Sequence, residues 1–275
     1  MESETVQIEE SVIEEERSIL SKIVVAKNFD WVNKECLVVV IKVDKTDFCD
    51  NLSNIEVCGK SVLDWVLMST CGPEQKVIED QGERSLLETL KNISQNKSYV
   101  FVAYSDTPFL QRSTFLKIMD YVSASGINAL ELPRGYVFKA SYLKNLTTLS
   151  CSMKKTFSDG DFVMLTSAGL LSSFFDFTAS KIRAFHKKNG VTLFGEETIF
   201  IDADVEIEKG TIIYPNNVLK GETSIGKNVV LRSGNLIENS VIFDDAQVEG
   251  SVIISSKVSR GKGIPPLTKL NNESV

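Results

Sequence analysis

The feature that most constrains the fold is a row of apolar residues that recurs every six positions in the last third of the chain. Six residues turn an α-helix by about 600°, so a helix would scatter these positions around its circumference. A strict period of six is instead typical of a parallel β-helix, in which three hexapeptides complete one triangular coil. The row consists of Ile207, Ile213, Leu219, Ile225, Leu231 and Ile237.

A second row precedes each member of the first by two positions and has the same period. Its members are Val205, Thr211, Asn217, Thr223, Val229 and Asn235. After one five-residue step the apolar row continues at Ile242 and Val248, and then more loosely at Ile253 and Val258. We therefore expect a short left-handed parallel β-helix of about three and a half coils over residues 191–259. Residues 260–275 are expected to form a tail with little order.

The part of the chain before residue 166 alternates apolar strands with amphipathic helices. Such alternation indicates an α/β layer with a parallel sheet, here over residues 36–165. A long helix is predicted over residues 166–190, and residues 1–35 form an acidic extension with a helix expected over residues 5–27. The predicted strands lie within residues 35–44, 76–80 and 99–106, the helices within residues 61–69, 84–93 and 112–126, and a further strand and helix within residues 135–146.

Charge and composition exclude several classes of protein. The net charge is −7 and the pI is near 5.0, which disfavours nucleic acid or an anionic membrane as partner. No stretch reaches the roughly 18 apolar residues of a membrane helix, and the start lacks the pattern of a secretion signal, so a cytoplasmic location is expected. The five cysteines lack C-x-x-C spacing and the chain has one histidine, His186. Neither a disulfide framework nor a zinc site is predicted.

The run YVFVAYSDTPFL (99–110) places Asp106 at the end of an apolar strand. An acid in that position can hold a metal ion at the rim of an active site, or it can be an ordinary turn residue. The strand alone leaves both interpretations open.

The joint between the two parts carries a family resemblance. It reads FHKKNGVTLFGEETIFIDADVEIEKGTIIYPNNVLKGETSIG (185–226). This resembles the GlmU family of bifunctional N-acetylglucosamine-1-phosphate uridyltransferases and glucosamine-1-phosphate acetyltransferases, in which H-x-x-N-G-V-T leads to I-x-x-D-V-x-I-x-x-x-T-x-I-Y-P. The resemblance covers residues 36–258 and identifies the chain as a truncated and divergent member. It implies a nucleotidyltransferase-like, Rossmann-like α/β domain before the β-helix, and a structural role for His186.

The resemblance also implies where a uridyltransferase would bind phosphate. The glycines of the family's phosphate loop fall on Ile41 and Val43, whose branched side chains oppose a close approach of phosphate. Lys45 keeps a charge at the basic position and is the one candidate catalytic residue, whereas the position of the second family lysine falls on Leu52.

The nucleotide motif aligns with VIEDQGERS (77–85), where Asp80 and Gly82 are the candidate nucleotide-binding residues. Glu83 and Arg84 replace the family's Thr-Gly. The negative charge of Glu83 is unfavourable beside a nucleotide unless it is paired, for which Arg84 is a candidate.

The metal motif aligns with YSDTPFL, where Ser105 replaces a glycine and Asp106 is the candidate Mg²⁺ ligand. The second ligand position falls on Thr166 or Ser167, and neither supplies the amide oxygen of the family's asparagine. The sugar-binding stretch falls on LPRG (132–135), with Pro133 in the asparagine position.

These replacements favour a degenerate homologue that no longer catalyses uridyl transfer. It would act as a nucleotide-binding or sugar-nucleotide-binding, regulatory or scaffold protein, with UTP or a UDP-sugar, another protein, and further copies of the chain in a β-helix trimer as possible partners. Two alternatives stay open: an active Mg²⁺-dependent nucleotidyltransferase with an altered substrate, and a structural β-helix oligomeriser.

Overall fold

The computed structural model describes residues 30–275, except for residues 150, 152 and 159. The helix predicted over residues 5–27 lies outside this range. The described chain forms two compact units. An α/β unit comprises residues 30–56 and Ser61–Phe174, and a β-helix unit comprises Val57–Lys60 and Phe175–Val275.

A five-stranded sheet forms the centre of the α/β unit, in the order β4-β1-β5-β7-β6. Strands β1, β4 and β5 are parallel, as the sequence predicts. The hairpin β6–β7 differs from the prediction, because β7 runs antiparallel to both β5 and β6. The sheet is therefore mixed. Its strands are β1 (Cys36–Lys42), β4 (Glu74–Glu79), β5 (Tyr99–Tyr104), β6 (Ala129–Leu132) and β7 (Gly135–Lys139).

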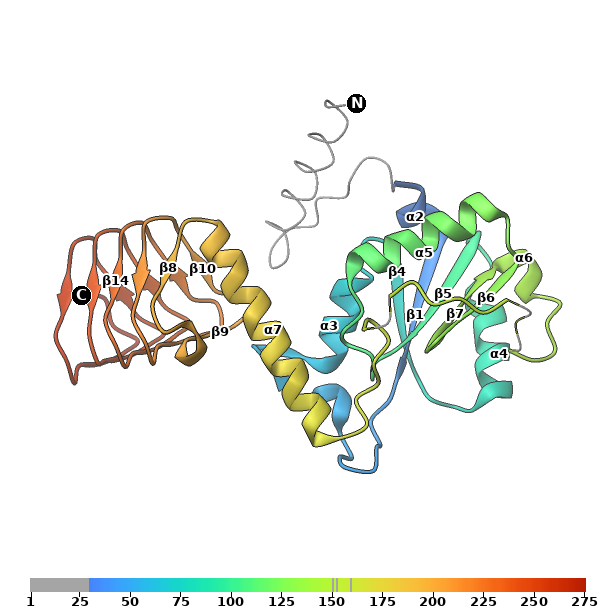
Figure 1. The fold of residues 1–275 in the computed structure, drawn as a ribbon, viewed down its shortest axis with the longest axis horizontal. Coiled ribbons are helices and arrows are strands. Elements are labelled where there is room, and N and C mark those ends of the chain that lie inside the picture. Colours follow the sequence, from blue (N-terminus) through green and yellow to red (C-terminus); the bar gives the residue numbers. More distant parts are fainter. Residues whose placement is uncertain (1–29, 150, 152, 159) are drawn as a thin grey trace. The chain divides into compact units, whose positions relative to one another are not determined.

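Helices cover both faces of this sheet (Figure 1). Strand β1 is buried on both sides: Val38 and Val40 contribute to one apolar core, and Leu37 and Val39 to the other. Burial of such side chains contributes about 1.5–3 kcal/mol each, which explains the continuous apolar run of this strand. The first core is packed by α2 (Asp30–Glu35), α3 (Val62–Ser69) and α5 (Arg112–Ser125), and the second by α4 (Glu83–Ile93) and α6 (Ala140–Leu143).

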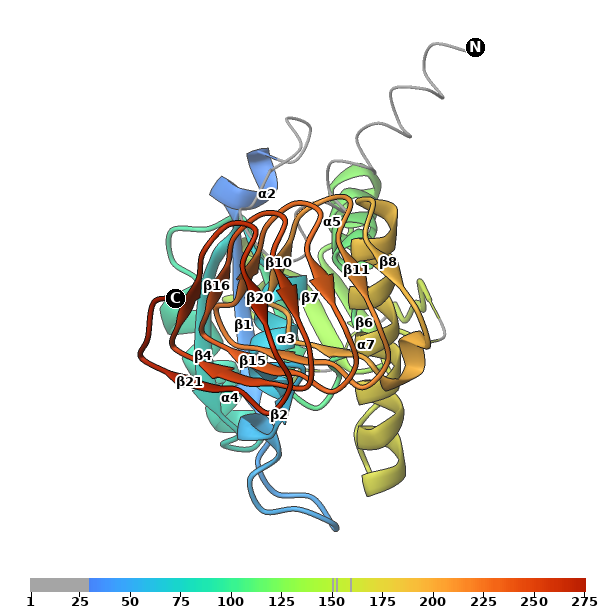
Figure 2. The ribbon, with the colours of Figure 1, turned by 90° about the vertical axis from the view of Figure 1, so that its left-hand side faces the viewer.

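The second unit is a left-handed parallel β-helix (Figures 1 and 2). Helix α7 (Ala168–Lys188) leads into it, and its short strands form one four-stranded and two five-stranded parallel sheets. The tip of the hairpin β2–β3 (Glu56–Val57 and Lys60–Ser61) also packs here, because the N–H of Ala203 donates to the Cys58 carbonyl at 2.9 Å. The coil strands are β8 (Thr192–Leu193), β9 (Phe200–Ile201), β10 (Glu206–Ile207), β11 (Ile212–Ile213), β12 (Val218–Lys220), β13 (Ser224–Ile225), β14 (Val230–Leu231), β15 (Leu236–Glu238), β16 (Val241–Ile242), β17 (Gln247–Val248), β18 (Val252–Ile254), β19 (Lys257–Val258), β20 (Gly263–Ile264) and β21 (Lys269–Asn271).

The predicted inner row is buried along the whole β-helix, from Ile207 to Val258. The prediction of a tail over residues 260–275 is wrong, because β20 pairs with β17 and β21 pairs with β18. Ile264 and Leu270 continue the six-residue register from Val258, and both are buried. The coil therefore extends further than the three and a half turns expected. The adjacent prolines that follow Ile264 lie between two strands, where the missing N–H groups disrupt no sheet pairing.

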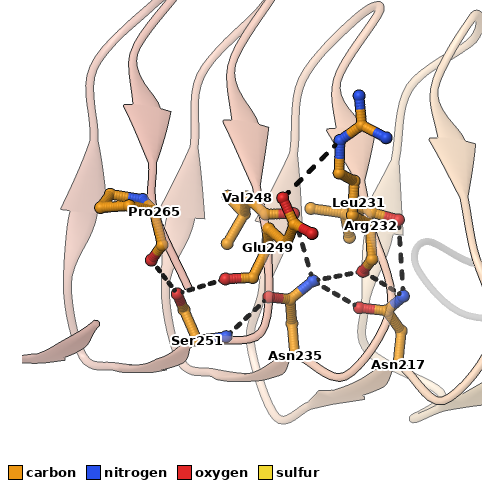
Figure 3. Close-up of polar contacts among 8 residues, drawn as sticks. All are labelled: Asn217, Leu231, Arg232, Asn235, Val248, Glu249, Ser251 and Pro265. Atoms are coloured by element: carbon orange, nitrogen blue, oxygen red, sulfur yellow. Dashed lines mark hydrogen bonds and ion pairs between the residues drawn. The ribbon is translucent and has the colours of Figure 1, made fainter. Parts of the chain in front are cut away.

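Polar members of the second row form a hydrogen-bonded ladder inside one corner of the coil (Figure 3). The side-chain amide of Asn235 donates to Asn217 Oδ1 at 2.8 Å and to the Arg232 carbonyl at 2.7 Å. Its oxygen accepts from the N–H of Ser251 at 3.0 Å, and the Ser251 hydroxyl donates to the Pro265 carbonyl at 2.9 Å. The ladder thus satisfies buried backbone groups where the chain turns between sheets, which explains polar residues within an apolar repeat.

Replacement of Asn235 by alanine is expected to weaken the coils on either side of it. The change removes the acceptor of the Ser251 N–H and the donor to Asn217 Oδ1, at a cost of about 2–4 kcal/mol, whereas the Arg232 carbonyl still accepts from Asn217. Hydrogen–deuterium exchange of residues 211–260 should accelerate accordingly. Asn271→Ala, on the exposed side of β21, is the matched control and should leave exchange unchanged. Equal protection in both variants would contradict a stabilising role of the ladder.

His186 is buried in the β-helix unit. The residue is 1% exposed, and neither ring nitrogen has a hydrogen-bond partner among the residues that the structure describes. Burial disfavours the charged imidazolium and lowers the pKa of His186 to about 4. The unfolded chain, with an ordinary histidine pKa, binds a proton first as the pH falls. His186 therefore reduces stability in the window between about pH 6.5 and pH 4.

We expect this single histidine to make the β-helix unit sensitive to mild acid. Between pH 7 and pH 5 the wild-type unit should lose about 2 kcal/mol more unfolding free energy than the His186→Phe variant. Urea titrations of both proteins at the two pH values measure this difference. Carboxylate titration is common to both chains and cancels, so equal losses would rule out the histidine as the cause.

Candidate functional site

The carboxyl ends of β1, β4 and β5 meet at one edge of the sheet, where ligands bind in open α/β folds. Each residue proposed from the sequence follows one of these strands. Lys45 lies in the loop after β1, Asp80 and Gly82 lie between β4 and α4, and Asp106 follows β5. The fold thus brings all of them to the same edge.

The backbone after β1 is closed against β5. The carbonyl of Ile41 accepts from the N–H of Ser105 at 2.9 Å, and the N–H of Val43 donates to the Ser105 hydroxyl oxygen at 2.8 Å. The Val43 carbonyl accepts from the hydroxyl of Ser53 at 3.0 Å. A phosphate-binding loop presents free backbone N–H groups to its ligand. At Val43 that donor is already used.

Ser105, which stands where the resemblance has a glycine, contributes through its side chain. Its hydroxyl lies 3.0 Å from that of Ser53, and both residues are fully buried. The two hydroxyls and the backbone of Val43 form one compact polar group in the interior. Glycine at position 105 would lack the oxygen that fixes this loop.

The basic residues of the first loop differ in their surroundings. Lys42 pairs with Asp44 at 2.7 Å and with Glu79 at 3.8 Å. Burial opposes ionisation of Asp44, but hydrogen bonds from Lys42 and Ser53 outweigh it and hold the pKa of Asp44 below its ordinary value. Lys45 is exposed and pairs with no described residue.

Leu52 cannot stand in for the family's second lysine. It is fully buried at the start of the short 3-10 helix η2 (Leu52–Asn54) and serves as a core residue.

The start of α4 is open and exposed. Gly82 caps the helix with φ +77°, and nothing lies within 4 Å of where a Cβ would be. Its N–H donates to Asp80 Oδ1 at 3.2 Å. Glu83 accepts from the N–H of Leu149 at 3.0 Å, so its charge is met by a backbone donor and not by Arg84. Asp80 and Gly82 therefore form a local turn at the helix start.

Asp106 is 6% exposed, and both of its carboxylate oxygens bind the guanidinium of Arg134. Nη2 lies 2.8 Å from Oδ2, and Nε lies 3.3 Å from Oδ1. The guanidinium also lies 3.9 Å from the centre of the Tyr104 ring, in a cation–π arrangement. Burial raises the pKa of Tyr104 to about 12, so its phenol stays neutral. Two independent contacts hold Arg134 in place.

The antiparallel hairpin β6–β7 brings Arg134 to this position. Leu132 pairs with Gly135, so Pro133 and Arg134 alone form the turn. Gly135 has φ +137°, and a Cβ there would lie 2.3 Å from the Val102 carbonyl oxygen, so glycine is required. The register between β5 and β7, continued by two residues, sets Arg134 opposite Tyr104.

The resemblance points to Pro133 in this stretch and not to its neighbour Arg134, which is the residue that contacts Asp106. Arg134 could be found from the sequence only if β7, which follows its turn, were known to pair antiparallel with β5, the strand that ends before Asp106. The alternation of strands and helices does not predict that pairing.

The residues at this edge do not fit Mg²⁺. The ion needs octahedral oxygen ligands, and both oxygens of Asp106 are engaged by Arg134. Thr166 and Ser167 are exposed, and the Ser167 hydroxyl accepts from the N–H of Leu170 at the start of α7. Among the described residues, no group of three or more His, Cys, Asp or Glu side chains could hold a metal. In the same part of the chain, no helix has the length and apolar character of a membrane crossing.

The chain matches no family model, but part of it is similar to proteins named bifunctional protein GlmU. Identity is 38% over 96 residues with the protein of Clostridium kluyveri, and 44% over 94 residues with those of Clostridium acetobutylicum and Listeria monocytogenes. The matched stretch is 34–35% of this chain and 21% of each relative. The similarity therefore spans about a fifth of the length of these relatives.

Two solved structures resemble the chain weakly. A CMP:2-keto-3-deoxy-manno-octonic acid synthetase in complex with CTP has 10% identity, a TM-score of 0.42 and coverage of 54% of this chain and 99% of its own. Rv0371c from Mycobacterium tuberculosis has 12% identity, a TM-score of 0.40 and coverage of 52% and 98%. These similarities are too weak to carry an inference. The sequence match stands on its own, and it makes this chain a divergent relative of the GlmU proteins, similar to them over about a third of its residues.

Proposed function

We propose that this chain is a GlmU-like protein that does not catalyse nucleotidyl transfer and acts by binding, as a regulatory or scaffold protein. The observation that carries the proposal is the bidentate pairing of Asp106 with Arg134. An enzyme that needs this carboxylate for a metal would have to displace the guanidinium in every catalytic cycle.

Phosphoryl transfer depends on positioned backbone donors, basic side chains and metal ions around the phosphates. At this edge most of these groups are engaged in internal contacts. The Val43 N–H binds Ser105, Lys42 binds Asp44 and Glu79, and Asp106 binds Arg134, which leaves Lys45 as the exposed cation of the first loop. These contacts are internal to the protein, and they leave the carboxyl edge of the sheet with few free groups to bind phosphate or metal.

The charges around the edge support the same proposal. Asp44, Glu79 and Asp80 follow or end the strands, and the cations Lys42 and Arg134 are already paired, which leaves Lys45 alone to attract an anion. A nucleoside triphosphate, with about four negative charges, would meet these carboxylates without a metal to screen them. Any UTP or UDP-sugar that binds should therefore do so weakly, and without Mg²⁺, at the exposed start of α4.

We expect no pyrophosphate release when the protein is incubated with Mg²⁺, each common nucleoside triphosphate and a panel of sugar 1-phosphates. The reason is that the Asp106 carboxylate and the Val43 N–H are engaged in internal contacts, which leaves Lys45 without the metal and the loop that phosphoryl transfer needs. The GlmU protein of Clostridium kluyveri is the comparison, assayed in parallel. Release by the wild type that disappears in Asp106→Asn would overturn the proposal and favour an active enzyme with an altered substrate.

A specific observation favours a second role, assembly of several copies through the β-helix. One sheet carries an outward row of apolar residues, with Phe200 41% exposed and Val218, Leu236 and Val252 half-buried. Apolar residues in line on one flat face are typical of a surface that is covered in an assembly. A closed trimer of identical chains would bury three such faces.

Light scattering at micromolar concentration tests this second role. The wild type should have the mass of a trimer, whereas Leu236→Lys should shift it to the monomer because a charge would be buried at the interface. Lys220→Ala, at an exposed position of the same sheet, is the control. A monomeric wild type would exclude assembly as the function.

A further inference from the structure

We propose that the tip of the hairpin β2–β3 caps the β-helix by taking the place of a coil before the first one. The tip consists of Val57–Lys60, and we call these four residues the hairpin cap. They belong to the β-helix unit, although in sequence they lie between two segments of the α/β unit. The proposal concerns the integrity of the first coil and does not depend on the proposed function.

A column of hydrogen bonds at one corner of the coil shows what the hairpin cap replaces. After β12, β15, β18 and β21 an N–H group donates to the coil before it: Gly221 to Asp202 Oδ2 at 3.1 Å, and Asn239, Ser255 and Asn272 to the carbonyls of Lys220, Glu238 and Ile254 at 3.3, 2.9 and 3.1 Å. Within the described chain β9 is the end strand of this sheet, so no coil precedes Ala203, which follows β9. The N–H of Ala203 donates to the Cys58 carbonyl at 2.9 Å. The hairpin cap therefore supplies the acceptor that a preceding coil supplies elsewhere.

The hairpin cap also has the backbone conformation of this corner. Gly59 follows the acceptor residue and has φ +78°. The residues at the corresponding places in the later coils have positive φ as well: Gly221 +60°, Asn239 +48°, Ser255 +48° and Asn272 +56°. Cys58 itself has φ +49°, which is uncommon for a residue with a side chain and persists only where the surroundings hold it. Contact with the first coil provides such surroundings.

Two side-chain contacts hold the hairpin cap on the first coil. A Cβ on Gly59 would lie 2.8 Å from Asp202 Cγ, so only glycine fits there. Gly221 faces the following coil in a similar way, since a Cβ there would lie 2.2 Å from Asn239 Oδ1. Lys60 Nζ lies 2.5 Å from Asp204 Oδ2, and both side chains are partly buried. The hairpin cap is thus held by a hydrogen bond, a close glycine contact and an ion pair.

Release of the hairpin cap would expose two groups that are now buried. Ala203 is fully buried and Cys58 is 8% exposed. Burial raises the pKa of the Cys58 thiol to about 12, so the docked thiol is unreactive. The base of the hairpin is closed separately, because the N–H of Val62 donates to the Ile55 carbonyl at 2.9 Å. Unpaired groups at a sheet edge are a template for pairing with other chains, and the hairpin cap covers this edge at the corner.

Two measurements on the full-length protein report release of the hairpin cap. They are the rate of Cys58 alkylation by iodoacetamide, followed by peptide mass spectrometry, and the amide exchange rate of Ala203, followed by nuclear magnetic resonance. Gly59→Ala should accelerate both at least about tenfold, because the new Cβ and the Asp202 side chain cannot occupy the same space. Exchange of the Ser255 N–H, in a later coil, should be unchanged.

Gly126→Ala is the matched control. Gly126 has φ +69°, and nothing lies within 4 Å of where its Cβ would be, so the substitution strains the backbone without a clash. This variant should match the wild type in both measurements. Wild-type rates in Gly59→Ala would overturn the proposal. Faster alkylation of Cys58 with full protection of Ala203 would also overturn it, because the Ala203 N–H would then not depend on the hairpin cap.

A second variant keeps the proposal testable if Gly59→Ala does not fold. Lys60→Met removes the ion pair with Asp204 and keeps the length of the side chain, so both rates should rise by a smaller factor. Lys227→Met, which removes the exposed pair with Glu208 elsewhere in the β-helix unit, is its control and should leave both rates unchanged. Equal rates in Lys60→Met and Lys227→Met would count against the hairpin cap.

Discussion

The buried carboxylate of Asp106, at the end of β5, needs a positive charge beside it, and the side chain of Arg134 supplies that charge. Asp106 is nearly excluded from water, and Arg134 meets both of its oxygens. A metal ion in that place can exchange and can bridge to a ligand, whereas a guanidinium that donates to the carboxylate and packs on Tyr104 stays attached. The residues around the edge are arranged about this fixed pair, and the chemistry open to the edge follows from it.

The other substitutions at the edge are coupled in the same way. The N–H of Val43 donates to the hydroxyl of Ser105, and the family resemblance aligns both residues with glycines. Ser53 closes the group by donating to the Val43 carbonyl. A glycine at position 105 would leave the Val43 N–H without its acceptor, which costs about 1–3 kcal/mol. Val43 takes part through its backbone alone, so a glycine at position 43 would keep both hydrogen bonds. Ser105 is therefore the side chain that stabilises this loop.

Sequence patterns predicted the parts of this structure that depend on local periodicity. The six-residue register of Ile207 to Ile237 requires that each coil stack on the previous one, so the β-helix followed from spacing alone. Ile264 and Leu270 keep that register, but the adjacent prolines between them have the composition of a loop, and the last coil was missed. In the α/β unit the pairing of Arg134 with Asp106 joins residues 28 positions apart in sequence. The antiparallel register of β5 and β7 brings the two residues together, and no repeat in the sequence of either strand predicts that register.

The two units also differ in how far a site residue can change without loss of the fold. The cores of the α/β unit are formed by strand and helix side chains such as Val38, Leu37 and Phe101, which lie away from the carboxyl edge. Arg134 is 30% exposed at its side chain, and its backbone is held by strand pairing and by Gly135, so its side chain acts on the edge through its charge. Asn235 inside the β-helix acts on the stacking of the coils, because its amide satisfies backbone groups of the neighbouring coil. The first side chain sets the charge at the carboxyl edge, and the second holds successive coils together.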